Sequence, residues 1–140
     1  MTSSSHFQIW EHRQVRWRRR RANGLPDYDE ASRTELRSLL EAAVAASFDV
    51  DSAALRLPTR GRKRVALARQ TAIYLAHVGC GLNLTEAGRL FDRDRTTAAH
   101  ACQVVEMLRE AVEFDTALAL LERVVRIIGW PWRQPCRLSP

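Results

Sequence analysis

The chain has 140 residues, of which 46% are hydrophobic and 27% are charged, and this composition predicts one globular domain flanked by tails. Its 22 lysines and arginines outnumber 16 acidic residues and give a net charge of +6, which favours a polyanionic partner. No apolar run approaches the roughly 18 residues that cross a bilayer, and no G-x-x-x-x-G-K-[ST] motif occurs. These absences exclude a membrane span and a nucleotide-driven motor.

The cysteines and the first residues favour the cytoplasm. Cys80, Cys102 and Cys136 are odd in number and widely spaced, which does not suggest a disulfide framework. The first residues lack the apolar stretch of a secretory signal. We therefore expect a protein of the reducing cytosol.

Residues 1–31 are predicted to form a flexible basic arm. Six positive charges with no acid between them stand at Arg13, Arg16, Arg18, Arg19, Arg20 and Arg21. Such an arm could neutralise phosphates or enter a minor groove, and it could equally be a solvated tail. Apolar residues interleave with the charges, so an amphipathic helix at a membrane surface is a third interpretation.

The first half of the zone 32–128 predicts three helices. Ser32-Arg33-Thr34-Glu35 matches a capping box, and a helical stripe of apolar residues follows it at Leu36, Leu39, Leu40, Ala43 and Val44. A short helix is predicted over residues 51–56 and is stopped by Pro58. The basic stretch 60–64 then leads into a longer helix that ends near Gly79 and Gly81.

Three further helices follow. Asn83-Leu84-Thr85-Glu86 matches a second capping box, which opens a helix of two turns. After the tight connection 91–93, Asp94 can cap the next helix. The stripe of that helix is Ala98, Ala101, Cys102, Val105 and Leu108. A last helix is predicted over 115–128, with Leu118, Leu121, Val125 and Ile128 on its buried face. The chain is therefore predicted to be all-α, with six helices.

A short helix, a tight turn and a longer helix form the layout of a helix-turn-helix. Thr96, His100 and Gln103 share the outward face of the second helix, and Asp94, Arg95 and Thr97 stand at its N-terminal end. Residues there can reach base edges in the major groove: arginine can grip guanine, aspartate can accept from cytosine, and threonine methyls can meet thymine methyls. A capped surface helix fits the same local pattern, so both interpretations stay open.

The stretch 62–109 resembles the C-terminal DNA-binding domain of the bacterial replication initiator DnaA. The most specific piece is RDRTTAAHACQVVE at 93–106, and Arg69-Gln70 and the L-x-E-x-G-x-x-F pattern at 84–91 match as well. Weaker similarity reaches back to Thr34, so the resemblance covers about residues 34–128.

The resemblance implies a six-helix bundle with a Trp-repressor-like helix-turn-helix, which reads a short asymmetric box of the TTATNCACA type in double-stranded DNA. It places base contacts at Asp94, Arg95, Thr96 and Thr97. It places phosphate contacts at Gln70, His77, Leu84, Thr85 and His100. The basic loop that enters the minor groove corresponds to Arg60, Arg62, Lys63 and Arg64, within residues 60–64.

The chain departs from the family pattern at three places. Arg95 stands where the family usually has histidine, and Gly61 aligns with the arginine of the minor groove, so Arg60 or Arg62 would have to substitute. The turn at Phe91-Asp92 is one residue shorter than the usual turn with two glycines. These differences leave the exact DNA sequence preference open.

The leading hypothesis is a DNA-binding protein without enzymatic activity, cofactor, metal or small-molecule substrate. It would regulate replication initiation at DnaA-box-like sites without an ATPase domain, as a stand-alone DnaA-related protein of the cytoplasm associated with the nucleoid. Two alternatives stay open: a module that binds the initiator or its inactivating machinery, and a transcription regulator. Residues 129–140 form a predicted tail in which Trp130 and Trp132 flank Pro131, and this tail could anchor a partner or fold back on the domain.

Overall fold

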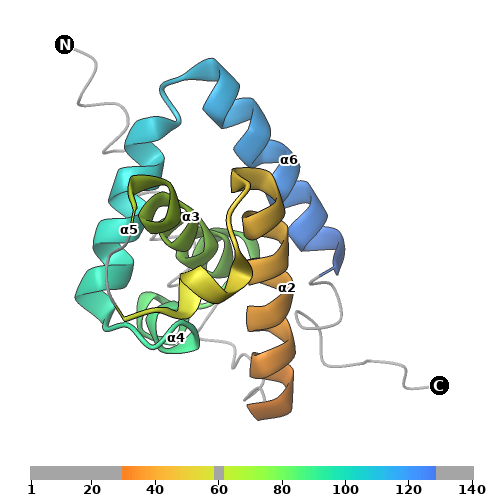
Figure 1. Cartoon of the computed structure of the whole chain (residues 1–140), viewed down its shortest axis with the longest axis vertical. Helices are drawn as coiled ribbons and strands as arrows, with labels where there is room; N and C mark the ends of the chain where they lie inside the picture. Colours follow the sequence, from red (N-terminus) through yellow and green to blue (C-terminus); the bar gives the residue numbers. More distant parts are fainter. Residues whose placement is uncertain (1–29, 59–61, 129–140) are drawn as a thin grey trace.

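A computed structural model describes residues 30–58 and 62–128 of the chain. Arg60, Gly61, nearly all of the predicted basic arm and the whole C-terminal tail lie outside the described residues. The described part forms five α-helices, a 3-10 helix and a π-helical turn, and Figure 1 shows how the helices are arranged. The prediction of an all-α fold is confirmed. The short helix that the sequence predicts over residues 51–56 is the 3-10 helix.

The elements follow one another with short connections. In chain order they are α2 (Glu30–Phe48), η1 (Ser52–Arg56), α3 (Lys63–Tyr74), η2 (Leu75–Gly79), α4 (Leu84–Leu90), α5 (Arg95–Leu108) and α6 (Val112–Ile128). The 3-10 helix is η1 and the π-helical turn is η2. Among these described helices, none has the length and apolar content that crossing a membrane requires.

Helix α2 starts earlier than its sequence pattern predicts. Glu30 is already helical, and the hydroxyl of Thr34 donates to the carbonyl of Glu30 over 3.0 Å. Ser32 therefore lies within the first turns of the helix, and the prediction that it begins a capping box is wrong. Leu36, Leu40 and Val44 are buried as predicted. Leu39 is 38% exposed, because it lies at the edge of the stripe that faces the core.

Helix α3 runs through the centre of the molecule. In Figure 1 it lies between α5 on one side and α2 on the other. Alanines on its buried face let the neighbouring helices approach, and Tyr74 and Leu75 at its end are fully enclosed. The turn η2 continues it to Gly79, where an added Cβ would lie 3.3 Å from Cγ1 of Val125 in α6. The centre of the core is therefore the junction of α3 with α5 and α6.

A capped helix and a closed turn connect α3 to α5. The second capping box is confirmed, because Asn83 Oδ1 accepts from the Glu86 N–H over 2.6 Å and Glu86 Oε2 accepts from the Asn83 N–H over 2.9 Å. After α4, Asp92 adopts a positive φ of 57°. The N–H of Arg93 donates to the carbonyl of Gly88 over 2.8 Å, which closes the helix end as a Schellman motif does. This short closed turn fixes the direction of α5.

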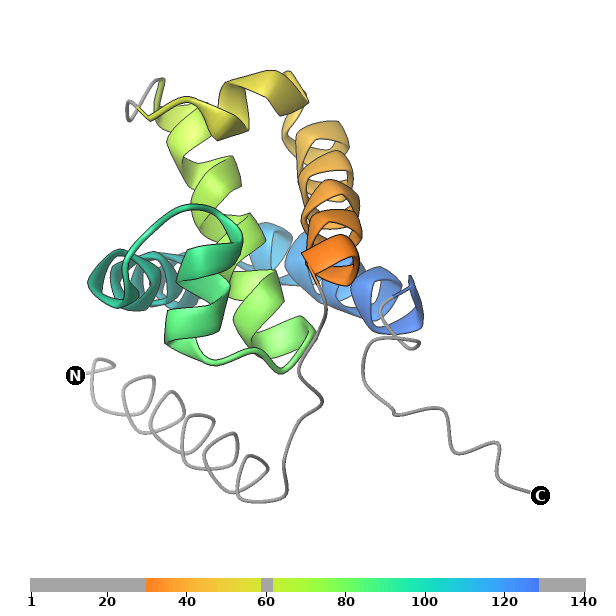
Figure 2. The same cartoon turned by 90° about the horizontal axis from the view of Figure 1, so that it is seen from below.

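Helix α6 begins at Val112, three residues before the predicted start. Leu118 and Val125 are buried as predicted, whereas Ile128 and, at the end of α5, Leu108 are exposed. A buried polar network joins α6 to α3 and α5. The guanidinium of Arg109 donates to the Tyr74 hydroxyl over 2.7 Å and to the Glu122 carboxylate over 2.6 Å, and the Tyr74 hydroxyl donates to Glu106 over 2.7 Å. Figure 2 shows the three helices crossing near one another.

Candidate nucleic-acid interface

The first turn of α5 presents a row of side chains to solvent. Arg95, Thr96 and Thr97 are exposed, and so is Asp94 just before them, whereas Ala98 and Ala101 behind them are fully buried. The apolar stripe of α5 packs on the core, which turns the opposite face outward. The four predicted base-contacting residues therefore share one accessible surface at the N-terminal end of the second helix of the motif.

Asp94 is also the N-cap of α5. Its Oδ1 accepts from the N–H of Thr97 over 2.7 Å, as its position predicts. This hydrogen bond favours the charged carboxylate and lowers the pKa of Asp94 below its ordinary value. One carboxylate oxygen is thus engaged at the helix end, and the other is the one left for a base.

Two arginines outside the exposed row of α5 hold the turn that leads into this helix. Arg37 of α2 donates from Nη1 to Oδ2 of Asp92 over 2.9 Å, and Arg93 donates from Nη2 to the carbonyl of Leu57 over 3.0 Å. Leu57 directly follows η1 and precedes the basic loop. The turn is therefore fixed on one side to α2 and on the other to the chain that enters the basic loop.

A buried arginine of α3 holds η1 and the residue that follows it from inside. The guanidinium of Arg69 donates from Nε to the carbonyl of Leu55 over 2.9 Å, and from Nη2 to the carbonyls of Leu57 over 3.1 Å and Ala54 over 3.3 Å. Sequence reasoning did not assign this role to Arg69 or to Arg93. The available signal was an arginine on the otherwise apolar face of an alanine-rich helix, because a buried guanidinium requires several acceptors.

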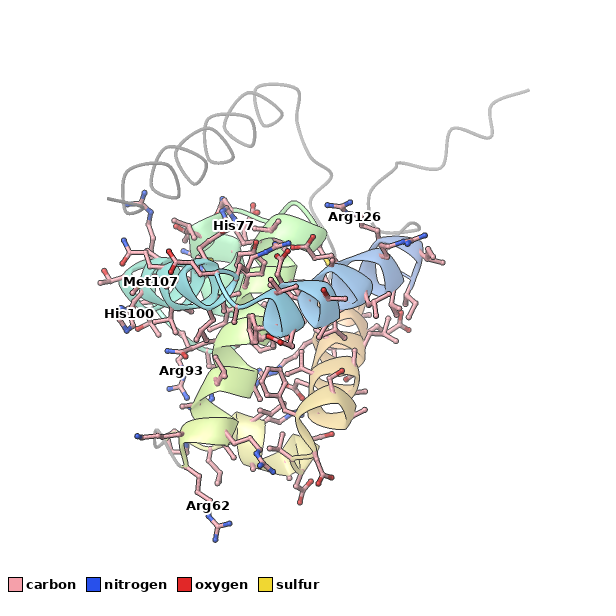
Figure 3. The ribbon with its side chains drawn as sticks, turned by 90° about the horizontal axis from the view of Figure 1, so that it is seen from above. Arg62, His77, Arg93, His100, Met107 and Arg126 are labelled. Atoms are coloured by element: carbon pink, nitrogen blue, oxygen red, sulfur yellow. The ribbon has the colours of Figure 1, made fainter. Side chains whose placement is uncertain are left out.

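Arg62, just before α3, stands on the same side of the molecule as Arg93 of the turn. Arg62, Lys63 and Arg64 are exposed where α3 begins, and Arg60 lies outside the described residues. Figure 3 shows Arg62, Arg93 and His100 following one side of the molecule. A DNA duplex along this side would meet positive side chains next to the exposed turn of α5.

The predicted phosphate-contacting residues occupy unlike environments. His100 is exposed on α5, and Gln70 and Thr85 are half-buried. Leu84 is buried, so only its main-chain N–H in the first turn of α4 could meet a phosphate. His77 is buried as well, and its Nδ1 donates to the carbonyl of Leu82 over 2.7 Å. The structure thus brings His100 to the same face as the base-contacting row and directs the side chains of His77 and Leu84 inward.

Residues 38–105 match the family described as the bacterial DnaA protein helix-turn-helix. The match runs from α2 into the last turn of α5, and it includes the basic loop, α4 and the exposed row from Asp94 to Thr97. The family is a double-stranded DNA-binding domain of replication initiators and is not catalytic. Residues 38–105 of this chain are therefore similar to the DnaA C-terminal helix-turn-helix domain.

Proposed function

We propose that this domain binds double-stranded DNA at DnaA-box-like sequences and thereby regulates the initiation of replication. Helix α5 enters the major groove with Asp94, Arg95, Thr96 and Thr97 at the base edges. The basic loop lies over the adjacent minor groove with Arg62, Lys63 and Arg64, and Arg60 belongs to the same loop in sequence. By occupying such boxes on the nucleoid, the protein competes with or assists the initiator.

The observation that carries this proposal is the exposed row at the start of α5. Four consecutive polar side chains stand free of the core, while the same helix is anchored by Ala98, Ala101, Cys102 and Val105, all nearly or fully buried. A rigid helix with an open N-terminal face is the geometry that major-groove recognition uses. The anchoring matters because base contacts discriminate only when the side chains are held in one position.

Each residue of the row makes a different contact with DNA. Arg95 reaches the O6 and N7 of guanine with two donors, and the Thr96 and Thr97 methyls meet thymine. Asp94 shares its carboxylate between Thr97 and a cytosine amine. His100 lies one turn further along α5 and contacts a phosphate together with Gln70 and Thr85.

Base reading is tested by fluorescence anisotropy with a DnaA-box duplex and a scrambled duplex at near-physiological salt. The wild-type chain is expected to prefer the box by about tenfold or more, which corresponds to roughly 1.4 kcal/mol. Arg95→Ala should lower box affinity by about 1–3 kcal/mol and reduce the preference. Arg126→Ala is the matched control, because it removes the same charge from an exposed site on α6.

Two results would contradict the proposal. Equal binding of both duplexes with steep salt dependence would mean that only charge is sensed. Equal losses in Arg95→Ala and Arg126→Ala would mean that the row at the start of α5 does not read bases. The interaction-module alternative would then take precedence.

A further inference from the structure

The turn before α5 carries an aspartate in a backbone conformation that favours glycine. Asp92 has a φ of 57°, where a Cβ crowds the neighbouring main chain. Its N–H donates to the carbonyl of Arg89 over 3.1 Å, and the N–H of Arg93 donates to the carbonyl of Gly88 over 2.8 Å. Two main-chain hydrogen bonds thus close this turn, and neither of them involves the carboxylate of Asp92.

The carboxylate of Asp92 instead meets an arginine of α2 that other contacts already fix. Nη1 of Arg37 donates to Oδ2 of Asp92 over 2.9 Å, and Nε of Arg37 donates to Oε1 of Glu41 over 2.6 Å. The Glu41 carboxylate is 3% exposed and also accepts from Nε of Arg56 over 2.8 Å. The guanidinium carbon of Arg37 lies 5.8 Å from the centre of the Phe91 ring, within the range of a cation–π contact. Arg37 is therefore held by Glu41 and Phe91 independently of Asp92.

This contact differs from an ordinary ion pair on a protein surface. The Asp92 side chain is 81% exposed, and an exposed pair usually contributes little because two flexible side chains must be ordered together. Here the Arg37 side chain is only 17% exposed and is already ordered by Glu41. The closed turn likewise fixes the main chain of Asp92. The pair therefore orders little that is not ordered already, and it links α2 directly to the turn.

We propose that Arg37 is a positioning residue for base reading: its contact with Asp92 fixes the direction in which α5 leaves the turn. Asp92 lies two residues before Asp94, the N-cap of α5 and the first residue of the exposed row. Base contacts discriminate only when the side chains that make them are held in place. The inference rests on the proposed function, and it makes the preference for the box depend on a residue of α2 outside the row.

The test is Asp92→Gly in the full chain, which removes the carboxylate and leaves a residue that adopts the positive φ without strain. The melting temperature should stay within about 5 °C of the wild type, because the relief of strain offsets most of the lost ion pair. The preference for the DnaA-box duplex over the scrambled duplex, measured by fluorescence anisotropy, should fall by about two- to tenfold. This preference is a ratio of two affinities, so the loss of one negative charge largely cancels in it.

Asp49→Gly is the matched control, because Asp49 is also an exposed aspartate with a positive φ, of 52°. Within residues 30–58 and 62–128 it forms no ion pair. It should keep the wild-type preference for the box. Asp92→Asn should keep it as well, because asparagine tolerates the positive φ and retains an oxygen that accepts from Arg37. Equal losses of preference in Asp92→Gly and Asp49→Gly would overturn the inference.

Arg37→Lys tests whether Arg37 acts through Asp92. The lysine keeps a positive charge beside Glu41 but lacks the planar fork that serves two carboxylates at once. It should lower the preference for the box, and the double variant with Asp92→Gly should lose no more than Asp92→Gly alone. Additive losses, or a wild-type preference in Asp92→Gly, would overturn the inference and leave the proposed function standing. A wild-type chain that does not prefer the box would overturn both.

Discussion

Arg93 and Leu57, 36 residues apart in sequence, are joined by a hydrogen bond of 3.0 Å from the guanidinium Nη2 to the main-chain carbonyl. The same carbonyl accepts from Nη2 of Arg69 over 3.1 Å. Arg93 immediately precedes the cap of α5, and Leu57 precedes the basic loop. The turn before α5 and the chain that enters the basic loop are therefore tied together at one carbonyl oxygen.

Arg69→Lys is expected to loosen this tie. A lysine keeps the charge, but its single ammonium cannot serve the carbonyls of Ala54, Leu55 and Leu57 together. The free energy of unfolding, measured by urea denaturation, should fall by about 1.5–3 kcal/mol, the range for hydrogen bonds to charged groups. Affinity for the box should fall as well, because the carbonyl of Leu57, which Arg93 also contacts, is held less firmly.

Arg56→Lys is the matched control for that change. Arg56 is half-exposed and pairs with Glu41, which also accepts from Arg37. Its replacement should change stability by about 0.5 kcal/mol or less. Equal effects of the two substitutions would show that Arg69 has no special positioning role.

Gly88→Ala is expected to destabilise the helix-turn-helix, although alanine favours a helix over glycine by about 1 kcal/mol. A Cβ at position 88 would lie 2.7 Å from the carbonyl oxygen of Arg93 and 2.8 Å from that of Asp94. The turn would have to move away from α4, at a cost of about 1–3 kcal/mol as for other overpacked sites. Thermal unfolding and box binding should both report the change. A stabilised variant with intact DNA binding would contradict the close approach of α4 to the turn.

The variants Asp94→Asn and Asp94→Ala separate the helix-capping role of Asp94 from its proposed role in base contact. Asparagine caps a helix as well as aspartate does, so Asp94→Asn should keep the melting temperature and alter only DNA binding. Asp94→Ala should lower both. Should Asp94→Asn bind the box as the wild type does, the carboxylate would have no part in base reading.

The fall in the free energy of unfolding at low pH gives a second measure of the Asp94 cap. The Thr97 N–H lowers the pKa of Asp94 in the folded state, so its contribution is present above the unfolded pKa near 4 and is lost as pH falls through the lower folded pKa. Urea unfolding between about pH 5 and pH 2 should therefore show a loss in the wild type that is smaller in Asp94→Asn. If the free energy of unfolding fell equally with pH in the two proteins, the charged form of Asp94 would not be the one that caps the helix.

Tyr74→Phe is expected to weaken the junction of α3, α5 and α6. The Tyr74 hydroxyl donates to Glu106 and accepts from Arg109, and its loss should cost about 1–2 kcal/mol of unfolding free energy near neutral pH. Burial, followed by the nearby Glu106 carboxylate, raises the pKa of Tyr74 far above its ordinary value. The neutral phenol therefore stabilises the fold fully below the unfolded pKa near 10, and this contribution is lost as pH rises further.

The measurement for Tyr74 is the difference in unfolding free energy between wild type and Tyr74→Phe as a function of pH. The difference should be constant up to about pH 9 and should narrow above about pH 10. A constant difference to higher pH would mean that the phenol is not held in its neutral form.

Several elements could be predicted from the sequence because their signals are local. The Asn83 capping box and the Asp94 cap depend on residues only three positions apart, and both form as predicted. The Ser32 pattern has the same spacing and failed, because the helix already includes Glu30. A capping pattern shows which residues could cap, and the helix starts where the whole segment gains most from packing.

The sequence by itself determined the order of the helices, the helix-turn-helix and the polar row at the start of α5, since periodicity and capping act within one or two turns. The tertiary structure alone decided that Arg93 meets Leu57, that Arg69 donates to the carbonyls of Ala54, Leu55 and Leu57, and that Glu106 and Glu122 are buried beside Arg109 and Tyr74. It also decided that α6 keeps a second apolar face in solvent. These contacts join residues many positions apart, so they depend on which helix faces meet. Local sequence patterns do not predict which faces meet.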